Sequence, residues 1–245
     1  MNVSTFKLKI KYDHAKNELD YTHNCIMFLK ENIDSEIKEI SKNHRKQKNT
    51  QDLIVDPDMM DLNENEKQSL IDEYYSEEYF HFESISKTLI ESIFIRQISI
   101  VEKYLVGISF DAYRHALGDC DELIPPNFTK KDKKKFSDCK LAVKSINKYL
   151  SVKVGDIKYY SLFINYRELR HKLAHGESYF HMPKEDMVKE LNREFDTNII
   201  IPENDFHEKN HYKFGNDYNL FIELNTCLEI LIRDVKVLLE TAYNS

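Results

Sequence analysis

The chain has 245 residues, of which 41% are hydrophobic and 12% aromatic, a composition that argues against a largely disordered protein. Its five glycines and five prolines are too few for a turn-rich β architecture, so long helices with few connections are expected. The net charge of −7 gives no support to bulk, nonspecific binding of nucleic acid. A nuclease with this composition would have to use a local positive cleft.

The sequence contains no targeting or membrane-spanning signal. Its four cysteines, Cys25, Cys120, Cys139 and Cys227, include no CxxC pair, which is typical of reduced structural thiols. No apolar run reaches the ~18 to 20 residues of a membrane span, and the N-terminus has no signal-like stretch. We therefore expect a soluble, cytoplasmic protein with no membrane partner.

Helical periodicity begins near the N-terminus. The first predicted helix covers residues 12–46, and a charged, turn-forming stretch follows it. Residues 1–60 are therefore expected to form an N-terminal helical arm, and residues 61–245 the main helical domain. The strongest helical pattern covers residues 79–108, where one apolar face recurs at three- and four-residue steps: Ile90, Phe94, Gln97, Val101, Leu105 and Ile108.

The second half of the chain predicts three more helices, over residues 134–150, 156–175 and 218–243. Two short β-like segments, residues 198–201 and 211–214, precede the last helix and are expected to pair as a hairpin. The predicted fold is therefore an all-α helical bundle with an N-terminal arm and a small β-hairpin-like excursion before its last helix.

The predicted helix over residues 156–175 has three distinct faces when its residues are placed 100° apart. One is an apolar stripe that must point toward the core: Leu162, Tyr166, Leu169 and Leu173. The second carries arginines, histidines and one small residue: Arg167, Arg170, His171, Ala174 and His175. The third is plainly solvated: Asn165, Glu168 and Lys172.

The arginine–histidine face has the residue types that phosphate-ester chemistry needs. Ala174 lies between Arg170 and His175 and leaves room for a substrate or a second copy of the helix. Gly176 suits the left-handed position that ends a helix, so His175 is expected in the last turn, where the helix dipole favours the imidazolium. Basic residues there also complement the dipole with no further function. A guanidinium at the core edge, as predicted for Arg170, does require an anion or other acceptors.

The string Arg170-His171-Lys172-Leu173-Ala174-His175 resembles the signature of the HEPN superfamily, an arginine, a polar residue, three residues and a histidine. These all-α domains include RNase toxins, abortive-infection proteins and the nuclease parts of some CRISPR effectors. The glycine after the string, the preceding helix with "SIVEKYL" and the long closing helix also fit the family's layout. The resemblance covers residues 80–245, and histidine at the second position is permitted although asparagine is more usual.

The resemblance implies metal-independent RNA cleavage, in which the RNA's 2′-hydroxyl attacks phosphorus and leaves a 2′,3′-cyclic phosphate. His175 would be the general acid or base, Arg170 would neutralise the phosphate, and His171 would orient the substrate or carry a second proton. Arg167 and Ala174 would support the substrate. Glu102 would pair with Arg170 and fix its rotamer, unless it is a solvated carboxylate at the helix edge.

The resemblance also implies the partners and the setting. RNA would be the substrate, no metal or cofactor is expected, and two protomers would face each other across the motif helix as a homodimer. A toxin–antitoxin or antiphage role follows, with an antitoxin protein as a possible partner. The alternative is a non-catalytic helical module for binding or dimerisation, such as the partner of a nucleotidyltransferase.

Three other patterns allow different chemistry. "HEKNH", residues 207–211, matches the HExxH string of zinc peptidases, with Glu229 downstream, but its flanks lack the helical periodicity that such a site needs. His171, His175 and His181 could hold a metal, but no further ligand is clearly placed. The lysine run at residues 130–135 could contact phosphate, although such runs more often begin a solvated helix.

Overall fold

The computed structural model describes residues 3–49, 63–118, 136, 138–175, 179–181, 200–202, 211–214 and 218–244. The fold is all-α, as predicted. Its helices are α1 (Val3–Asn49), α2 (Glu64–Ala116), α4 (Cys139–Leu150), α5 (Tyr160–Ala174) and α7 (Tyr218–Asn244), with a 3₁₀ turn, η2, at Val154–Asp156. None of the helices in the described ranges is long and apolar enough to cross a bilayer.

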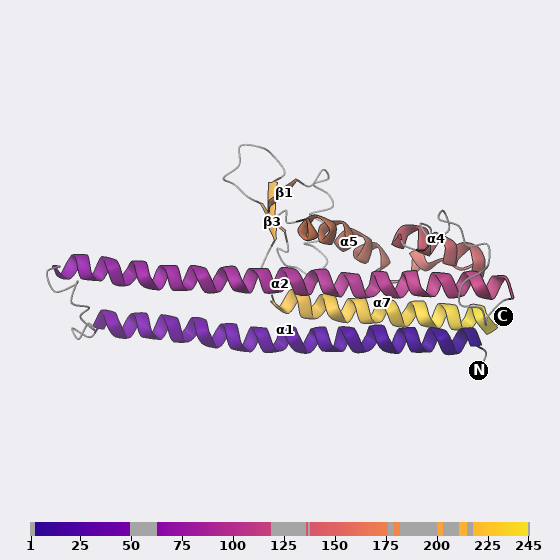
Figure 1. Ribbon diagram of the computed structural model, residues 1–245, viewed down its shortest axis with the longest axis horizontal. Helices are drawn as coiled ribbons and strands as arrows, with labels where there is room; N and C mark the ends of the chain where they lie inside the picture. Colours follow the sequence, from indigo (N-terminus) through magenta and orange to yellow (C-terminus); the bar gives the residue numbers. More distant parts are fainter. Residues whose placement is uncertain are drawn as a thin grey trace.

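The two longest helices, α1 and α2, run antiparallel beside each other (Figure 1). Ser4 contacts His115 near one end of the pair, and His44 contacts Asp72 near the other. Helix α7 packs along part of the same pair, while α4 and α5 lie on the other side of α2 (Figure 1). Contacts from Lys30 to Asn219 and from Ser86 to Tyr218 mark the place where α7 begins.

We call residues 3–30 of α1, residues 86–116 of α2 and helix α7 the proximal bundle. Its core is continuous with that of α5, because fully buried side chains of all four helices belong to one cluster, among them Leu19, Phe94, Phe163 and Phe221. The apolar faces predicted for residues 79–108 and for residues 156–175 are both buried. Helical periodicity therefore identified the correct buried stripes.

A buried polar network connects the three helices of the proximal bundle. The Gln97 side-chain amide donates to the Phe221 carbonyl at 2.9 Å and to Asn225 Oδ1 at 3.1 Å. The Asn225 amide in turn donates to the Leu19 carbonyl at 3.2 Å and to Glu229 Oε1 at 2.9 Å. Because buried polar groups are costly when unpaired, this network favours one register of α1, α2 and α7.

We call residues 31–49 and 63–85 the distal hairpin, which projects beyond the start of α7 (Figure 1). Its small separate core consists of Ile40, Ile71 and Tyr75, with Phe82 packed against it. At its far end α2 begins with a capping box, in which Asn63 accepts from the backbone of Glu66 and Glu66 accepts from the backbone of Asn63.

Several helix boundaries differ from the predicted ones. Helix α2 begins at Glu64 rather than at residue 79, because the capping box and pairing with α1 extend it through a charged stretch in which Ile71 and Tyr75 are buried. Helix α4 begins at Cys139, where Asp138 accepts from the Leu141 backbone N–H at 2.9 Å.

The proposed domain boundary at residue 60 and the lysine run at residues 130–135 lie outside the described residues. The first half of α1 shares the main core with α2, α5 and α7. The division of the chain into an arm and a domain stays a prediction.

A small antiparallel sheet comes before α7. It contains β1 (Tyr179–His181), β2 (Ile200–Pro202) and β3 (His211–Phe214) in the order β1-β3-β2. Strands β2 and β3 overlap the two segments that were expected to form strands, and they pair with each other. Strand β3 also pairs with β1, which was not predicted.

Candidate functional site

Helix α5 places the arginine–histidine face of the predicted motif on the outside of the core. Tyr159 precedes the helix with φ of 66°, a left-handed conformation that is unusual for a bulky residue. From there the buried stripe of Leu162, Tyr166, Leu169 and Leu173 packs toward the core. Phe163 is buried as well, which the helical wheel did not anticipate.

Glu102 of α2 lies between the two arginines of this face. Arg167 Nε donates to Glu102 Oε1, and Arg170 Nη1 lies 3.4 Å from Glu102 Oε2. The Glu102 side chain is only 14% exposed, whereas those of Arg167 and Arg170 are 22% and 27% exposed. The ion pair between Glu102 and Arg170, one of the two alternatives that the sequence left open, is therefore present. Arg167 Nη2 also lies 3.6 Å from Asp138 Oδ2, so two carboxylates face the two guanidiniums, and Arg170 keeps only its 3.4 Å ion pair with the shared Glu102.

The charges around Glu102 also shift neighbouring pKa values. Burial lowers the pKa of Arg167, but the hydrogen bond and charge of Glu102 outweigh burial and raise it. Burial, with a smaller contribution from Glu102, raises the pKa of the Cys139 thiol to about 12. Burial likewise raises the pKa of Tyr160 to about 12. Cys139 therefore stays a thiol at neutral pH and is a poor nucleophile.

Arg170 is directed toward α2 by two partners. Besides the contact with Glu102, its Nη2 donates to Ser99 Oγ at 3.1 Å. Its Nε is buried and makes no hydrogen bond within the described part of the chain. A guanidinium with one weak ion pair, one hydroxyl partner and partial exposure retains the capacity to bind an anion.

His171 and His175 form a second group at the C-terminal end of α5. Their ring centroids lie 4.6 Å apart, edge to face, and both residues are exposed, as is Ala174. His175 was expected in the last helical turn, but it is the C-cap residue directly after the helix, with its N–H bonded to the Lys172 carbonyl at 3.1 Å. Gly176, expected to end the helix, lies outside the described residues.

The site thus consists of two groups rather than one. Glu102, Arg167, Arg170 and Ser99 form the first, and His171 with His175 forms the second. Among the described residues, no hydrogen bond or ion pair joins Arg170 to either histidine. Arg170 and His175 are separated by about 7.5 Å along the helix axis, so a phosphodiester could contact both only by bridging them.

Sequence reasoning missed Ser99 and Asp138. Ser99 lies three residues before Glu102 in α2, a spacing that places both on one helical face, so this signal was available. Asp138 Oδ2 lies 3.6 Å from Arg167 Nη2. Asp138 comes from a distant part of the sequence, and no local pattern relates it to α5.

The competing metal sites receive no support. His211 lies in β3 rather than in a helix, whereas an HExxH zinc site needs its histidines one helical turn apart; residues 207–210 lie outside the described residues. Glu229 lies in α7 and accepts from Asn225. In the described part of the chain, no three His, Cys, Asp or Glu side chains are grouped closely enough to hold a metal ion.

A scan against protein-family models found no match, and searches of the curated proteins and of the solved structures found none.

Proposed function

We propose that the protein is a metal-independent endoribonuclease of the HEPN type, with its site on α5. The observation that carries this proposal is the orientation of Arg170 by Glu102 and Ser99 beside the exposed pair of His171 and His175. A partly buried arginine held by a carboxylate and a hydroxyl is preorganised for phosphate, and the adjacent imidazoles supply groups that transfer protons near neutral pH.

In this proposal the scissile phosphodiester bridges the two groups of the site. Arg170 stabilises the charge that develops on the phosphate oxygens, while Arg167 and the small, exposed Ala174 support the strand. One histidine removes the proton from the attacking 2′-hydroxyl, and the other protonates the leaving 5′-oxygen. The products are a 2′,3′-cyclic phosphate and a free 5′-hydroxyl.

The wider proposal follows from the resemblance to the HEPN superfamily. The helices would form a HEPN-like bundle with a hairpin-like excursion, and two protomers would face each other across α5 so that each motif assists the other. The protein would act on RNA in the cytoplasm as a toxin or an antiphage factor, restrained by an antitoxin protein.

The test is cleavage of RNA by the purified chain in the presence of EDTA. We expect products ending in a 2′,3′-cyclic phosphate, and loss of activity by about a hundredfold or more in Arg170→Ala and His175→Ala. Arg233→Ala and His14→Ala are matched controls, because these residues have side chains 57% and 74% exposed on other helices. Both controls should retain full activity.

Three results would contradict the proposed chemistry. They are dependence on a metal, equal cleavage of a DNA strand that lacks 2′-hydroxyls, and unchanged cleavage in the His175→Ala variant. Growth arrest on overexpression, relieved by His175→Ala, would support a toxin. A protein that only binds a partner, the alternative function, would be indifferent to that substitution.

A further inference from the structure

Four large apolar side chains lie on the surface of the α1–α2 pair near the start of α7. Tyr21 and Phe28 of α1 are 60% and 64% exposed, and Ile85 and Leu89 of α2 are 43% and 37% exposed. Single exposed apolar residues are ordinary in soluble proteins, but a group of them marks a contact surface. We call these four residues the outer face.

A groove of about 640 Å³ runs between the two helices at the outer face. Phe28 and Leu89 line it together with Cys25, Leu29 and Ile93, and α7 contributes none of its described residues. Ile26 is buried in the core, and Phe28, two residues later, points about 200° away around the helix. The groove is therefore on a side of the pair that α7 does not cover.

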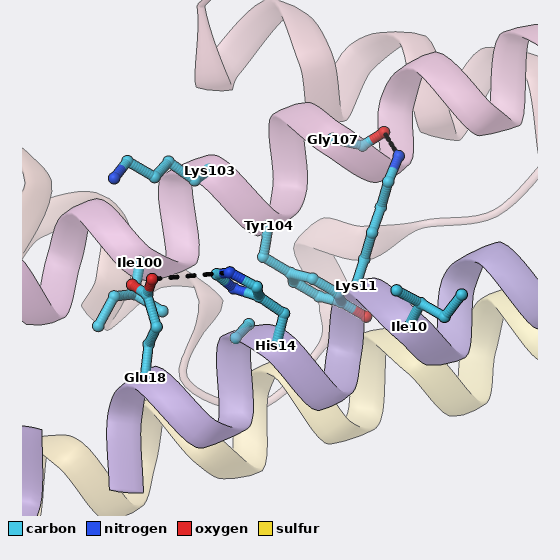
Figure 2. Close-up of a pocket in the computed structure, with 9 residues that line it drawn as sticks. Ile10, Lys11, His14, Glu18, Ile100, Lys103, Tyr104 and Gly107 are labelled. Carbon is cyan, nitrogen blue, oxygen red and sulfur yellow. Dashed lines mark hydrogen bonds and ion pairs between the residues drawn. The ribbon is translucent and has the colours of Figure 1, made fainter. Parts of the chain in front are cut away.

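The open side of the pair continues toward the N-terminus of α1. A second pocket of about 220 Å³ lies between the same helices, and its lining includes Ile10, His14 and Tyr104. In Figure 2, the Tyr104 side chain points from α2 toward α1, and Lys11 reaches from α1 to the Gly107 carbonyl. Ile10 is 52% exposed and lies about 27 Å along α1 from Phe28, with Lys11, His14 and Glu18 between them on the same side.

The two helices of the distal hairpin differ in charge. Residues 35–49 of α1 carry five lysines or arginines and two glutamates, whereas residues 64–84 of α2 carry seven acidic side chains and one lysine. The two segments lie at the same level of the hairpin, since His44 Nε2 is 2.7 Å from Asp72 Oδ1. Over residues 31–49 the α1 segment carries five basic and four acidic side chains, so its positive charge is concentrated in residues 38–48, whereas the α2 segment is acidic.

We propose that a second copy of this chain packs on the outer face, with the two-fold axis parallel to the helices. This symmetry places α1 of each copy over α2 of the other at the same level. The basic end of α1 then lies on the acidic beginning of the other copy's α2, and the reverse contact is made as well. Phe28 of each copy enters the other's groove next to Leu89, and each hairpin becomes half of an antiparallel four-helix bundle.

A two-fold axis perpendicular to the helices is the other way to pair these faces. It would place α1 on α1 and send the two hairpin tips in opposite directions, so the basic and acidic segments would not meet. The charge pattern therefore selects the parallel axis. Helix α1 is about 70 Å long, which is long enough to supply the roughly 800 Å² per partner that is typical of a stable dimer.

The outer face is distinct from the motif face of α5 and does not depend on the proposed ribonuclease activity. The two surfaces adjoin on α2, because Ile95, which lines the groove, lies one helical turn from Ser99, which contacts Arg170. The measurements below contain no RNA, so their outcome is separate from that of the cleavage assay.

Sedimentation of the full chain over a concentration series tests the proposal. We expect self-association through the outer face that weakens as salt is raised, giving a dimer, or a tetramer where the motif faces of α5 pair as well, and Phe28→Glu should increase the dissociation constant of the outer-face contact by about tenfold or more. Phe80→Glu is the matched control, because Phe80 is 66% exposed and lies about 180° around α2 from Leu89. Unchanged helicity by circular dichroism will show that both variants fold.

Cross-linking tests the register of the two copies. In a Cys25→Ser background, chains carrying Phe28→Cys are mixed with chains carrying Leu89→Cys. Oxidation should then give disulfide-linked dimers only in the mixture, because the parallel axis puts Phe28 over the other copy's Leu89. A chain that stays monomeric, a dimer indifferent to Phe28→Glu, or a mixture that does not cross-link would each overturn the proposal.

Discussion

The proximal bundle and the distal hairpin use the same two helices, but among the described residues only the proximal bundle has a third helix that completes its core. In the proximal part, residues such as Leu19, Phe94 and Leu105 are fully buried. In the distal part the described core is limited to Ile40, Ile71 and Tyr75, with Phe82 against it. A pair of helices can bury only one stripe of each, so helix formation in the distal hairpin depends more on capping and charge pairing.

The comparison also separates two kinds of polar contact. In the proximal bundle, Gln97 and Asn225 are both fully buried and linked to each other. In the distal hairpin, His44 and Asp72 form a contact whose side chains are 30% and 44% exposed. The first kind is costly to break because no water can replace the lost partner, whereas the second is weakened by solvent.

The largest expected difference concerns the two cores. Phe94→Ala removes a fully buried ring that packs edge to face on Tyr166 and Phe221, and it should lower the free energy of unfolding by about 3–5 kcal/mol. Tyr75→Ala, in the small distal core, should lower it by about 1–2 kcal/mol. Urea denaturation followed by circular dichroism measures both. Equal losses would show that the distal core contributes as much to stability as the proximal core and would contradict the distinction.

A smaller effect is expected from the polar contacts. Asn225→Ala leaves the Leu19 carbonyl without its side-chain donor and should cost about 1–3 kcal/mol. Asp72→Asn, which weakens the exposed pair with His44, should cost no more than about 1 kcal/mol. Lys9→Gln, at an exposed position of α1, exchanges two residues of similar helix propensity; it is the control and should leave the unfolding curve unchanged. A cost for Asp72→Asn as large as that for Asn225→Ala would contradict the ranking.

The sequence predicted the helices and their buried stripes best where apolar residues recur regularly. The stripe through Phe94 and Leu105 is confirmed because helical periodicity depends only on local spacing. The same reasoning missed residues 64–78 of α2, where Ile71 and Tyr75 are the buried apolar residues and most of the others are charged or polar. Their helical state depends on the Asn63 cap and on α1, which lies far away in the sequence.

The candidate site was predictable only in part for a related reason. The approach of Glu102 to Arg170 was anticipated because both residues lie at the edges of buried stripes. The spacing of Ser99 and Glu102 could have indicated that Ser99 contributes, but the competition of Arg167 for the same carboxylate depends on how α5 is rotated against α2. The sequence pattern of a single helix does not predict how that helix is rotated against its neighbour. The position of His175 just outside the helix likewise depends on the terminus, where boundaries are hardest to infer.

The smallest expected effect is a dependence of stability on pH in the proximal bundle. Burial, together with the negative charge of Asp20, raises the pKa of Glu229 above its usual range. The folded state then binds a proton more readily than the unfolded state. The resulting stabilisation is present at acidic pH, below the ordinary pKa of a glutamate, and is lost as the pH rises through the raised value.

Glu229→Gln removes this titration but keeps an oxygen that can accept from Asn225. We expect the variant to exceed the native chain in stability at about pH 7, by less than about 1 kcal/mol because Glu229 is partly solvated, and to show no such gain at about pH 4. Urea denaturation at the two pH values measures the difference, with Glu223→Gln, exposed on the same helix, as the control. If the variant gained the same stability at both pH values, the gain would come from packing and not from removal of the Glu229 charge. Glu229 would then not differ in its titration from the solvated carboxylates of the distal hairpin.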